Sequence, residues 1–568
     1  MDLEKKKEKR AMKKNVLKKF AAAALAAATV MSSMSVMAFA EETGEATTGS
    51  VTITKYESNT GAGETLSPEN YTGEAPTGEG YILLQGVEFA YVEVGERVQV
   101  DTAVENSSQT EIQYKVTNAD FLEAIGLDKT KLNTNFTQTE LNEAIKTKKT
   151  ETIAFVKAKA GANKKSTEAT TGAVKFDKLS LHKLYVFAET DATKAALASD
   201  GNTKVNVTKV SVPFLVSLPF TEKNGTTVKD LKVYPKNSTG EESIDKKIVE
   251  GETEKLTTAA NIGDTVNYKV TYSVPVTENG LESLVITDTM SKGLTFNESS
   301  DSVTVYNGDT KVDSENYSVK KSVDSSTGEQ IITITFTSEY CQSLTTDSTQ
   351  EFTITYTATL NEKAVLGQTG NTNKVQLKYT NKGEEEKTIS PDKDKEVKVF
   401  TYGIDLTKQG EGGAKLSEVE FKLTDGTNEI NVLKSGDAYY PSNDTKASST
   451  VTTDNNGEIH IRGLKPGTYK LKETKTNAGY VLLKNPVVIV ITQTNATTGV
   501  ATAKVGNKDV TMIEDNGSLT AKVPLTVVNS KGFNLPVTGG RGIALFTIAG
   551  IAIVAAAGSL LFMRKRSK

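Results

Sequence analysis

The sequence predicts an all-β protein made of β-sandwich domains in tandem. Short alternating segments, such as 266–274, 330–337 and 352–360, are separated by Gly, Asn and Asp residues, which is typical of strands and turns. Thr, Val, Asn and Gly are abundant, and Pro is scarce at 12 of 568 residues, which favours strands over helices. A chain of this length has room for three or four domains. One helical segment is expected, near 120–143.

The composition excludes several kinds of functional site. The chain holds 2 His, 1 Cys and no Trp, so a His/Cys metal cluster and a disulfide within the chain are ruled out. A Cys-His or Ser-His catalytic site is not expected with so little His. The formal net charge of -4 gives no reason to expect a nucleic acid as a partner. The two ends are basic and the body between them is acidic. This pattern is typical of a chain whose ends are targeting signals and whose body is the mature product.

Residues 1–40 have the pattern of a secretory signal peptide. A basic stretch precedes an Ala-rich apolar run, 20–40, which closes with Ala38-Phe39-Ala40. A basic region, an apolar core and an A-x-A end define such a signal. An N-terminal membrane anchor is the alternative. The mature chain is expected to begin at Glu41.

The C-terminus, 535–568, has three parts. The motif Leu535-Pro536-Val537-Thr538-Gly539 is followed by a mostly apolar run, 542–563, and by a basic tail. The run is long enough to span a bilayer, and the basic tail keeps its end in the cytoplasm. This ending resembles the Gram-positive cell-wall sorting signal, L-P-x-T-G. The resemblance implies that a sortase, a cysteine transpeptidase, cuts after Thr538 and passes the Thr carboxyl group to an amine. An ordinary tail-anchored protein is the alternative.

Composition also sets the expected domain boundaries. Three domains are expected, with a charged joint at 392–396 between the second and the third. The expected ranges are 41–237, 238–391 and 399–530.

Three strands of the third domain each carry a polar side chain in line with apolar ones. Lys408, Glu473 and Asn529 each follow two apolar residues at a spacing of two, and side chains two apart share one face of a strand. A buried lone Lys, Glu or Asn is costly, so the three are expected to be partners in the core. A surface strand with chance alternation is the alternative.

The third domain also resembles a known type of domain. The strings 467–474, Gly-Thr-Tyr-Lys-Leu-Lys-Glu-Thr, and Ala478-Gly479-Tyr480 resemble the Cna-B-type immunoglobulin-like domains of Gram-positive surface proteins. Those domains form an internal isopeptide bond between Lys and Asn, assisted by a Glu. The resemblance therefore implies a bond from Lys408 to Asn529 with Glu473 as the acid.

Elementary chemistry agrees with such a bond. Desolvation lowers the pKa of a Lys and raises the pKa of a Glu. The amine then becomes a neutral nucleophile, and the protonated acid can polarise the Asn carbonyl and transfer protons as ammonia leaves.

The first domain repeats the pattern. Lys55 and Glu189 each follow two apolar residues at a spacing of two, and the last strand ends at Asn237. We expect a Cna-B-like domain with a bond from Lys55 to Asn237 and Glu189 as the acid.

The second domain differs because its acid is an Asp. Apolar residues stand two positions away from each of Lys246, Asp288 and Asn373, so each shares a strand face with apolar side chains. The segment 285–294 around the acid resembles the middle, Cna-A-like domain of major pilins. The implied bond joins Lys246 to Asn373, with Asp288 as the acid. Lys247, which the alternation places outward, is the alternative nucleophile.

The segment Tyr234-Pro235-Lys236-Asn237 resembles the pilin motif of backbone pilins, Y-P-K-N. In that family the motif Lys attacks the sortase-bound Thr of the next subunit, so the resemblance implies a bond from Lys236 to Thr538 of a neighbour. We expect Lys236 to be exposed at a domain junction. Asn237 should point inward, since adjacent residues of a strand face opposite sides.

Taken together, these features are interpreted as those of a major, or backbone, pilin that is secreted, anchored to the cell wall and polymerised covalently. It is expected to be no enzyme in the turnover sense and to need no cofactor or metal. The implied partners are a class C-type pilin sortase, a housekeeping sortase, identical subunits, tip and basal pilins, and peptidoglycan, with a role in adhesion and colonisation. The alternatives are a single-copy wall-anchored adhesin that binds host matrix, a tip or basal pilin, and a cell-surface hydrolase.

Overall fold

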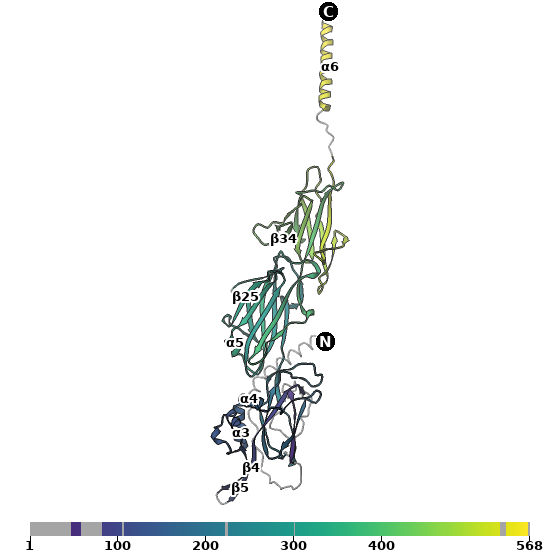
Figure 1. Cartoon of the computed structure of the whole chain (residues 1–568). Helices are drawn as coiled ribbons and strands as arrows, with labels where there is room; N and C mark the ends of the chain where they lie inside the picture. Colours follow the sequence, from purple (N-terminus) through teal and green to yellow (C-terminus); the bar gives the residue numbers. More distant parts are fainter. Residues whose placement is uncertain are drawn as a thin grey trace.

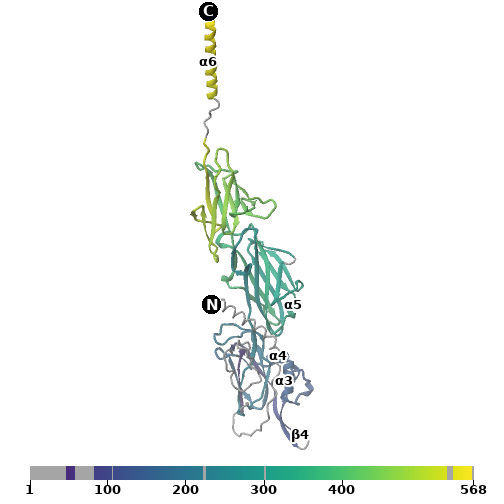
Figure 2. The same ribbon diagram turned by 180° about the vertical axis from the view of Figure 1, so that it is seen from behind.

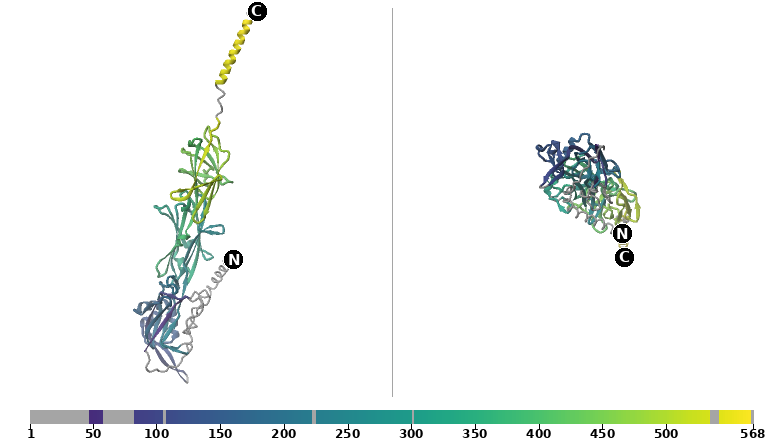
Figure 3. Two further views of the ribbon diagram at one scale, coloured as in Figure 1. Left: turned by 90° about the vertical axis from the view of Figure 1, so that its right-hand side faces the viewer. Right: turned by 90° about the horizontal axis from the view of Figure 1, so that it is seen from below.

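The computed structural model describes residues 47–57, 82–104, 107–221, 225–299, 302–533 and 541–565. The predicted signal peptide, 1–40, lies outside these residues, and so does the sorting motif, 535–539, with Thr538. The described part is mostly β and forms three β-sandwich domains that stand in line, with a C-terminal helix beyond them (Figures 1 and 2). The all-β prediction is therefore confirmed. The view from the side shows the same elongated stack (Figure 3).

The first domain is built on a six-stranded sheet of order β12-β9-β4-β5-β6, with β7 beside β4. One face of this sheet packs against helices, and the other packs against the three-stranded sheet β15-β1-β8. Strand β9 is buried over nearly its whole length because both of its faces are covered. A third small sheet has the order β11-β16-β2. Two strand pairs complete the domain: β3 (Leu84–Gln85) with β10 (Ala196–Leu197), and β13 (Phe220–Thr221) with β14 (Thr227–Val228). The strands of the three larger sheets are β1 (Thr48–Thr54), β2 (Tyr56–Glu57), β4 (Glu88–Val104), β5 (Ser107–Val116), β6 (Asn135–Phe136), β7 (Lys164–Ser166), β8 (Ala173–Ser180), β9 (Lys183–Asp191), β11 (Asn206–Lys209), β12 (Phe214–Val216), β15 (Asp230–Val233) and β16 (Lys236–Gly240).

The helices of the first domain extend beyond the expected segment, 120–143. That segment holds α2 (Ala119–Ala124) and much of α3 (Gln138–Thr147), but α4 (Lys149–Lys159) follows almost at once. A capping box starts α3, which is a signal that can be read from sequence. Helix α4 has no side-chain cap at its start, and its buried side chains pack into the same core cluster as the sheet. Tertiary packing therefore orders α4.

The middle domain is a sandwich of two seven-stranded sheets around one apolar core. One sheet runs β18-β17-β20-β27-β23-β24 and the other runs β19-β30-β28-β21-β26-β25. The first sheet consists of β17 (Ser243–Glu250), β18 (Thr253–Lys255), β20 (Thr265–Val276), β23 (Val303–Asn307), β24 (Thr310–Lys311) and β27 (Ser348–Leu360), with β22 (Leu294–Phe296) beside β27. The second consists of β19 (Thr257–Ala259), β21 (Leu281–Met290), β25 (Tyr317–Val323), β26 (Gln330–Phe336), β28 (Asn371–Asn381) and β30 (Val397–Phe400), with β29 (Lys387–Ile389) beside β28. The short helix α5 (Ser338–Ser343) lies outside the sheets (Figure 1).

The third domain is a sandwich of two six-stranded sheets, also around one core. In one sheet β31 lies between β36 and β42. That sheet consists of β31 (Tyr402–Gly410), β33 (Val432–Ser435), β34 (Ala438–Pro441), β36 (Glu458–Leu464), β41 (Ile513–Asp515) and β42 (Ser518–Asn529). The facing sheet consists of β32 (Glu420–Thr424), β35 (Thr450–Thr452), β37 (Gly467–Lys475), β38 (Val487–Asn495), β39 (Val500–Val505) and β40 (Lys508–Val510).

The joint between the middle and third domains differs from the expected one. Val399, where the third domain was expected to begin, pairs with Asn371 in a sheet of the middle domain. The change of sheet occurs at Thr401, between β30 and β31. The charged segment 392–396 contains a 3₁₀ turn, Lys393–Lys395, that leads into β30. The charged residues therefore form a surface turn and not a domain joint. The middle domain continues through β30, whose alternating apolar residues pack into its core.

The chain ends in helix α6 (Arg541–Lys565). Its segment Phe546–Lys565 is long and apolar enough to cross a membrane. It overlaps the predicted span, 542–563.

Candidate functional site

The third domain brings Lys408, Glu473 and Asn529 together in its core, and all three side chains are buried. Lys408 and Asn529 lie on the adjacent parallel strands β31 and β42, while Glu473 comes from β37 in the facing sheet. The Lys408 Nζ is 3.6 Å from Glu473 Oε1, and Asn529 Nδ2 donates to the same oxygen at 2.8 Å. Burial lowers the pKa of Lys408, and the nearby Glu473 opposes that shift. The acid therefore contacts both groups that an amide bond would join.

The first domain holds a site of the same composition. Lys55 Nζ lies 2.8 Å from Glu189 Oε2, and Asn237 Nδ2 donates to Glu189 Oε1. Ser211 donates to Glu189 Oε2 through both its backbone N–H and its hydroxyl, at 3.1 and 2.8 Å. Burial is the main cause that lowers the pKa of Lys55, and Glu189 opposes it. All of the predicted members of this site are therefore in contact.

The first and third sites also share one register. In the third domain the strand that carries the Asn, β42, runs parallel to β31, which carries Lys408. In the first domain β16 runs parallel to β2, which begins directly after Lys55. In each domain the Asn pairs with the residue two positions beyond the Lys, which is Glu57 in the first domain and Gly410 in the third. The two sites are therefore the same local arrangement, built in two domains with different surroundings.

The middle site is assembled across the sandwich. Lys246 lies on β17 in one sheet, and Asp288 and Asn373 lie on the neighbouring strands β21 and β28 of the other. The Lys246 ammonium contacts Asp288 Oδ2, and both groups are buried. Burial lowers the pKa of Lys246 to about 8 and raises the pKa of Asp288, although each partner opposes the shift of the other. Both shifts favour the neutral pair.

The alternative nucleophile of the middle domain has a different position. Lys247 forms an ion pair with Asp245 at 2.9 Å, and its side chain is 25% exposed. The alternation that pointed Lys247 outward is thus seen in the structure, and Lys246 is the lysine beside the acid.

Two tyrosines in the middle site were missed by the sequence analysis. The Tyr356 hydroxyl donates to Asp288 Oδ2 at 2.5 Å and accepts from Asn373 Nδ2 at 3.0 Å. Tyr268, opposite Tyr356 in the sheet, stacks on it with 5.4 Å between ring centroids. Both alternate into the core within the segments 266–274 and 352–360, so their spacing indicates only burial and does not separate a site residue from a core residue.

The Asn of each site has an unpaired carbonyl oxygen. Within the described part of the chain, the Oδ1 atoms of Asn237, Asn373 and Asn529 are buried and have no hydrogen-bond partner. A buried acceptor without a partner costs about 1–3 kcal/mol. Each of the three sites thus contains an amide that is incompletely satisfied in its unlinked form.

Lys236 begins β16, where it pairs with Tyr56 of β2. We expected it to be exposed, but it is half-buried. Its strand continues between β2 and β11 in a small sheet. Burial lowers the pKa of Lys236 to about 8. Asn237, the next residue, is fully buried, as expected.

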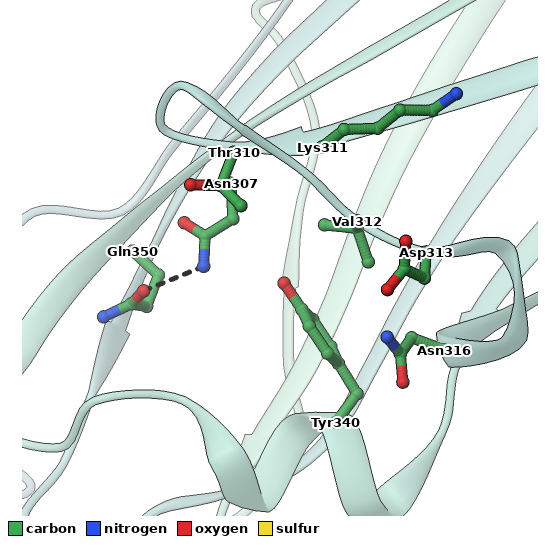
Figure 4. Close-up of a pocket in the computed structure, with 8 residues that line it drawn as sticks. All are labelled: Asn307, Thr310, Lys311, Val312, Asp313, Asn316, Tyr340 and Gln350. Carbon is green, nitrogen blue, oxygen red and sulfur yellow. Dashed lines mark hydrogen bonds between the residues drawn. The ribbon is translucent and has the colours of Figure 1, made fainter.

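A hollow on the middle domain lies apart from these sites (Figure 4). Its lining is mostly polar, and the Asn307 side-chain amide donates to Gln350 at one side of it. None of the residues predicted for the three sites lines it. The lining residues are Asn307, Thr310, Lys311, Val312, Asp313, Asn316, Tyr340 and Gln350.

Four family models match successive parts of the chain. Residues 46–238 match the N-terminal domain of Gram-positive pilin subunit D1, and residues 262–383 match Gram-positive pilin backbone subunit 2, a Cna-B-like domain. The chain is built from Gram-positive pilin domains. Residues 403–505 match a prealbumin-like fold domain, SpaA, and residues 527–568 match the LPXTG cell wall anchor motif. The middle domain thus matches a model described as Cna-B-like, where the sequence resemblance pointed to a Cna-A-like domain.

Individual relatives of this pilin chain are distant. It is 24% identical over 292 residues to the trypsin-resistant surface T6 protein of Streptococcus pyogenes serotype M6, which covers 48% of the chain and 51% of the relative. The match thus spans about half the length of that curated relative. The full-length major pilin SpaD of Corynebacterium diphtheriae has a TM-score of 0.48 at 19% identity, over 86% of this chain and 98% of SpaD. The RrgB pilus protein of Streptococcus pneumoniae has a TM-score of 0.47 at 18% identity, over 87% and 99%.

Proposed function

We propose that this chain is the structural subunit of a covalently polymerised surface pilus. The observation that carries the proposal is that each of the three sandwiches buries a Lys, an acid and an Asn in one hydrogen-bonded cluster, in a chain whose domains match pilin models. Such groups are costly in an apolar core, and a Lys–Asn amide removes the charge of the Lys. Each domain of the subunit is thereby cross-linked covalently without a disulfide. The domains of the subunit are proposed to be 41–237, 238–400 and 402–530.

The chemistry of each site needs only the groups present. The neutral Lys amine attacks Cγ of the Asn, a new C–N bond forms, and the amide nitrogen leaves as ammonia. The proton lost by the Lys balances the proton gained by the leaving nitrogen, and the acid carries it. In the first and third sites the acid contacts the Asn nitrogen directly, which is where the leaving group must gain its proton. Each site acts once on its own chain, so the protein is not a turnover enzyme.

Polymerisation uses a different lysine. Lys236 is proposed to attack the carbonyl carbon of Thr538 while that Thr is held by a pilin sortase, which joins one subunit to the next. Two features support this role: the half-buried side chain and its lowered pKa of about 8 make the neutral amine more abundant near neutral pH than in an ordinary lysine. A housekeeping sortase is proposed to join the last subunit to peptidoglycan. Tip and basal pilins, and adhesion to host surfaces, belong to the same proposal.

A substitution at Lys236 tests the proposal in cells. Lys236→Ala should give a folded, secreted monomer, and wall extracts should lose the ladder of covalent multimers on a denaturing gel. Lys232→Ala is the matched control, because Lys232 lies four residues earlier with an exposed side chain, and its ladder should equal that of the wild type. A wild-type ladder in Lys236→Ala would show that another lysine is the acceptor. No ladder in the wild type would indicate a single-copy wall protein.

A further inference from the structure

The three acid sites differ in how the acid meets the leaving nitrogen. In the first and third domains the Glu accepts directly from the Asn nitrogen, as Glu473 does from Asn529 at 2.8 Å. In the middle domain the nitrogen of Asn373 donates to the Tyr356 hydroxyl, which in turn donates to Asp288. An Asp side chain is one methylene shorter than that of a Glu. The hydroxyl of Tyr356 thus hydrogen-bonds both the acid and the Asn nitrogen, a bridge that the hydrogen bonds of the other two sites do not include.

The Tyr356 ring is held in place by the core. It is buried, stacks on Tyr268 and packs against Phe296 with 6.1 Å between ring centroids. The Lys246 Nζ lies over the same ring, 5.5 Å from its centroid. The hydroxyl of Tyr268 has no hydrogen-bond partner within the described part of the chain. Two tyrosines therefore share the site, but only Tyr356 hydrogen-bonds both the acid and the reacting amide.

We propose that Tyr356 is a catalytic residue of the middle domain and relays a proton from Asp288 to the leaving nitrogen of Asn373. This inference rests on the isopeptide chemistry proposed above. A phenol is suited to the task because its O–H can rotate, so that it donates to one partner while it accepts from another. Burial and the neighbouring Asp288 raise the pKa of Tyr356, so the hydroxyl keeps its proton between transfers.

The relay balances in protons and bonds. Lys246 Nζ, as a neutral amine, forms a bond to Cγ of Asn373. Tyr356 gives its hydroxyl proton to Nδ2 and takes the proton of Asp288, while the bond from Cγ to Nδ2 breaks and ammonia leaves. The Asp288 carboxylate then takes a proton from Nζ. Tyr356 and Asp288 end as they began, and one amide has replaced another.

The test follows bond formation in the full chain. The chain is recovered unfolded from inclusion bodies and refolded by dilution, and peptide mapping by mass spectrometry then measures the linked peptide of Lys246 and Asn373 over time. Tyr356→Phe should slow this link by about 100-fold or more, the usual size of a general acid–base contribution. The links in the first and third domains should form at the wild-type rate. Tyr272→Phe is the matched control, because Tyr272 is a buried tyrosine of β20 that stacks on Phe352 outside the site, and it should link Lys246 at the wild-type rate.

The outcomes separate the relay from the proposed function. A wild-type rate in Tyr356→Phe would overturn the relay and leave the bond itself intact. An absent link in the wild type would instead refute the proposed chemistry of the middle domain. Should protease digestion show that Tyr356→Phe does not fold, the wild type is refolded in mixtures of H₂O and D₂O. A relay that moves more than one proton predicts a curved dependence of the rate on deuterium fraction, and a linear dependence would contradict it.

Discussion

Lys236 and Asn237 are consecutive residues of β16, yet Asn237 is fully buried against Glu189 while Lys236 is only half-buried. The proposed attachment point for the next subunit and the proposed end of the first internal cross-link are thus one residue apart. The chain before Lys236 makes up the first domain, and the chain after it leads within ten residues to Lys246. This order decides how a pull along the pilus would travel.

Tension should bypass most of the middle and third domains. The force is applied at Lys236 and at Thr538. The proposed bond from Lys246 to Asn373 would carry it past the 126 residues between them, and the bond from Lys408 to Asn529 would carry it past another 120 residues. Without its bond, each loop would release roughly 400 Å of extended chain, at about 3.3–3.6 Å per residue. Single-molecule pulling through Lys236 and the C-terminus should show no long unfolding step in the wild type.

Two acid variants sharpen that experiment. Glu473→Ala should add one step near the length of the third domain's loop. Glu189→Ala should add none, because the first domain lies outside the path of the load. A long step in the wild type, or a new step from Glu189→Ala, would contradict the bond assignments or the load path.

The acid of the third domain should be required for its bond. Glu473→Gln keeps the shape of the side chain but cannot carry the proton, so Lys408 and Asn529 should stay unlinked. The intact mass should then exceed the wild-type mass by one ammonia, after allowance for the substitution. The chain-entropy model for a cross-link over a loop of this length suggests a loss of about 4–5 kcal/mol of stability.

A control for Glu473→Gln is available on the next strand. Glu420→Gln makes the same chemical change in β32, where Glu420 pairs with Lys475 at the surface, and its mass should show all of the bonds. An unchanged ammonia deficit in Glu473→Gln would show that the acid has been misassigned.

The adjacent lysines of β17 provide a matched pair for the middle domain. Lys246→Ala should abolish the linked peptide to Asn373, because the amine beside Asp288 is lost. Lys247→Ala removes only the ion pair with Asp245 and should leave the link complete. Peptide mapping distinguishes the two, and a link that survives in Lys246→Ala but not in Lys247→Ala would reverse the assignment.

The half-buried Lys236 should react at a lower pH than an ordinary lysine. Its pKa of about 8 means that the amine is mostly protonated below pH 8 and mostly neutral above it. Labelling of the full chain with an amine-specific reagent should therefore rise at Lys236 with a midpoint near pH 8, against about 10.4 for an unperturbed lysine. Site-resolved mass spectrometry measures the profile, and a midpoint near 10 would contradict the effect of burial.

The sequence predicted the sites better than it predicted their surroundings. Strand alternation places Lys408, Glu473 and Asn529 on inward faces, because that period is fixed by backbone geometry, and the structure brings the three side chains together. Alternation also separates Lys246 from Lys247. It carries no information on which buried tyrosine faces a reacting group, so Tyr356 could not be told from Tyr268.

Other features escaped prediction because they depend on tertiary packing. Helix α4 has no side-chain cap at its start that would indicate a helix in the sequence, and its buried side chains pack against the sheet. Lys236 is half-buried on β16, which pairs with β2, a strand far away in sequence, so its neighbours along the chain did not indicate its exposure. The charged segment before β30 suggested a joint, but the pairing of Val399 with β28 carries the middle domain to Thr401.

The central claim is that one subunit is joined to the next through Lys236, and the covalent link itself tests it most directly. Polymers extracted from the cell wall are digested, and the peptides that contain the Thr538 carboxyl group are sequenced by mass spectrometry. The account predicts a branched peptide in which Thr538 of one chain forms an amide with the Nζ of Lys236 of another. Thr538 found only on a different lysine, or only on peptidoglycan, would contradict it.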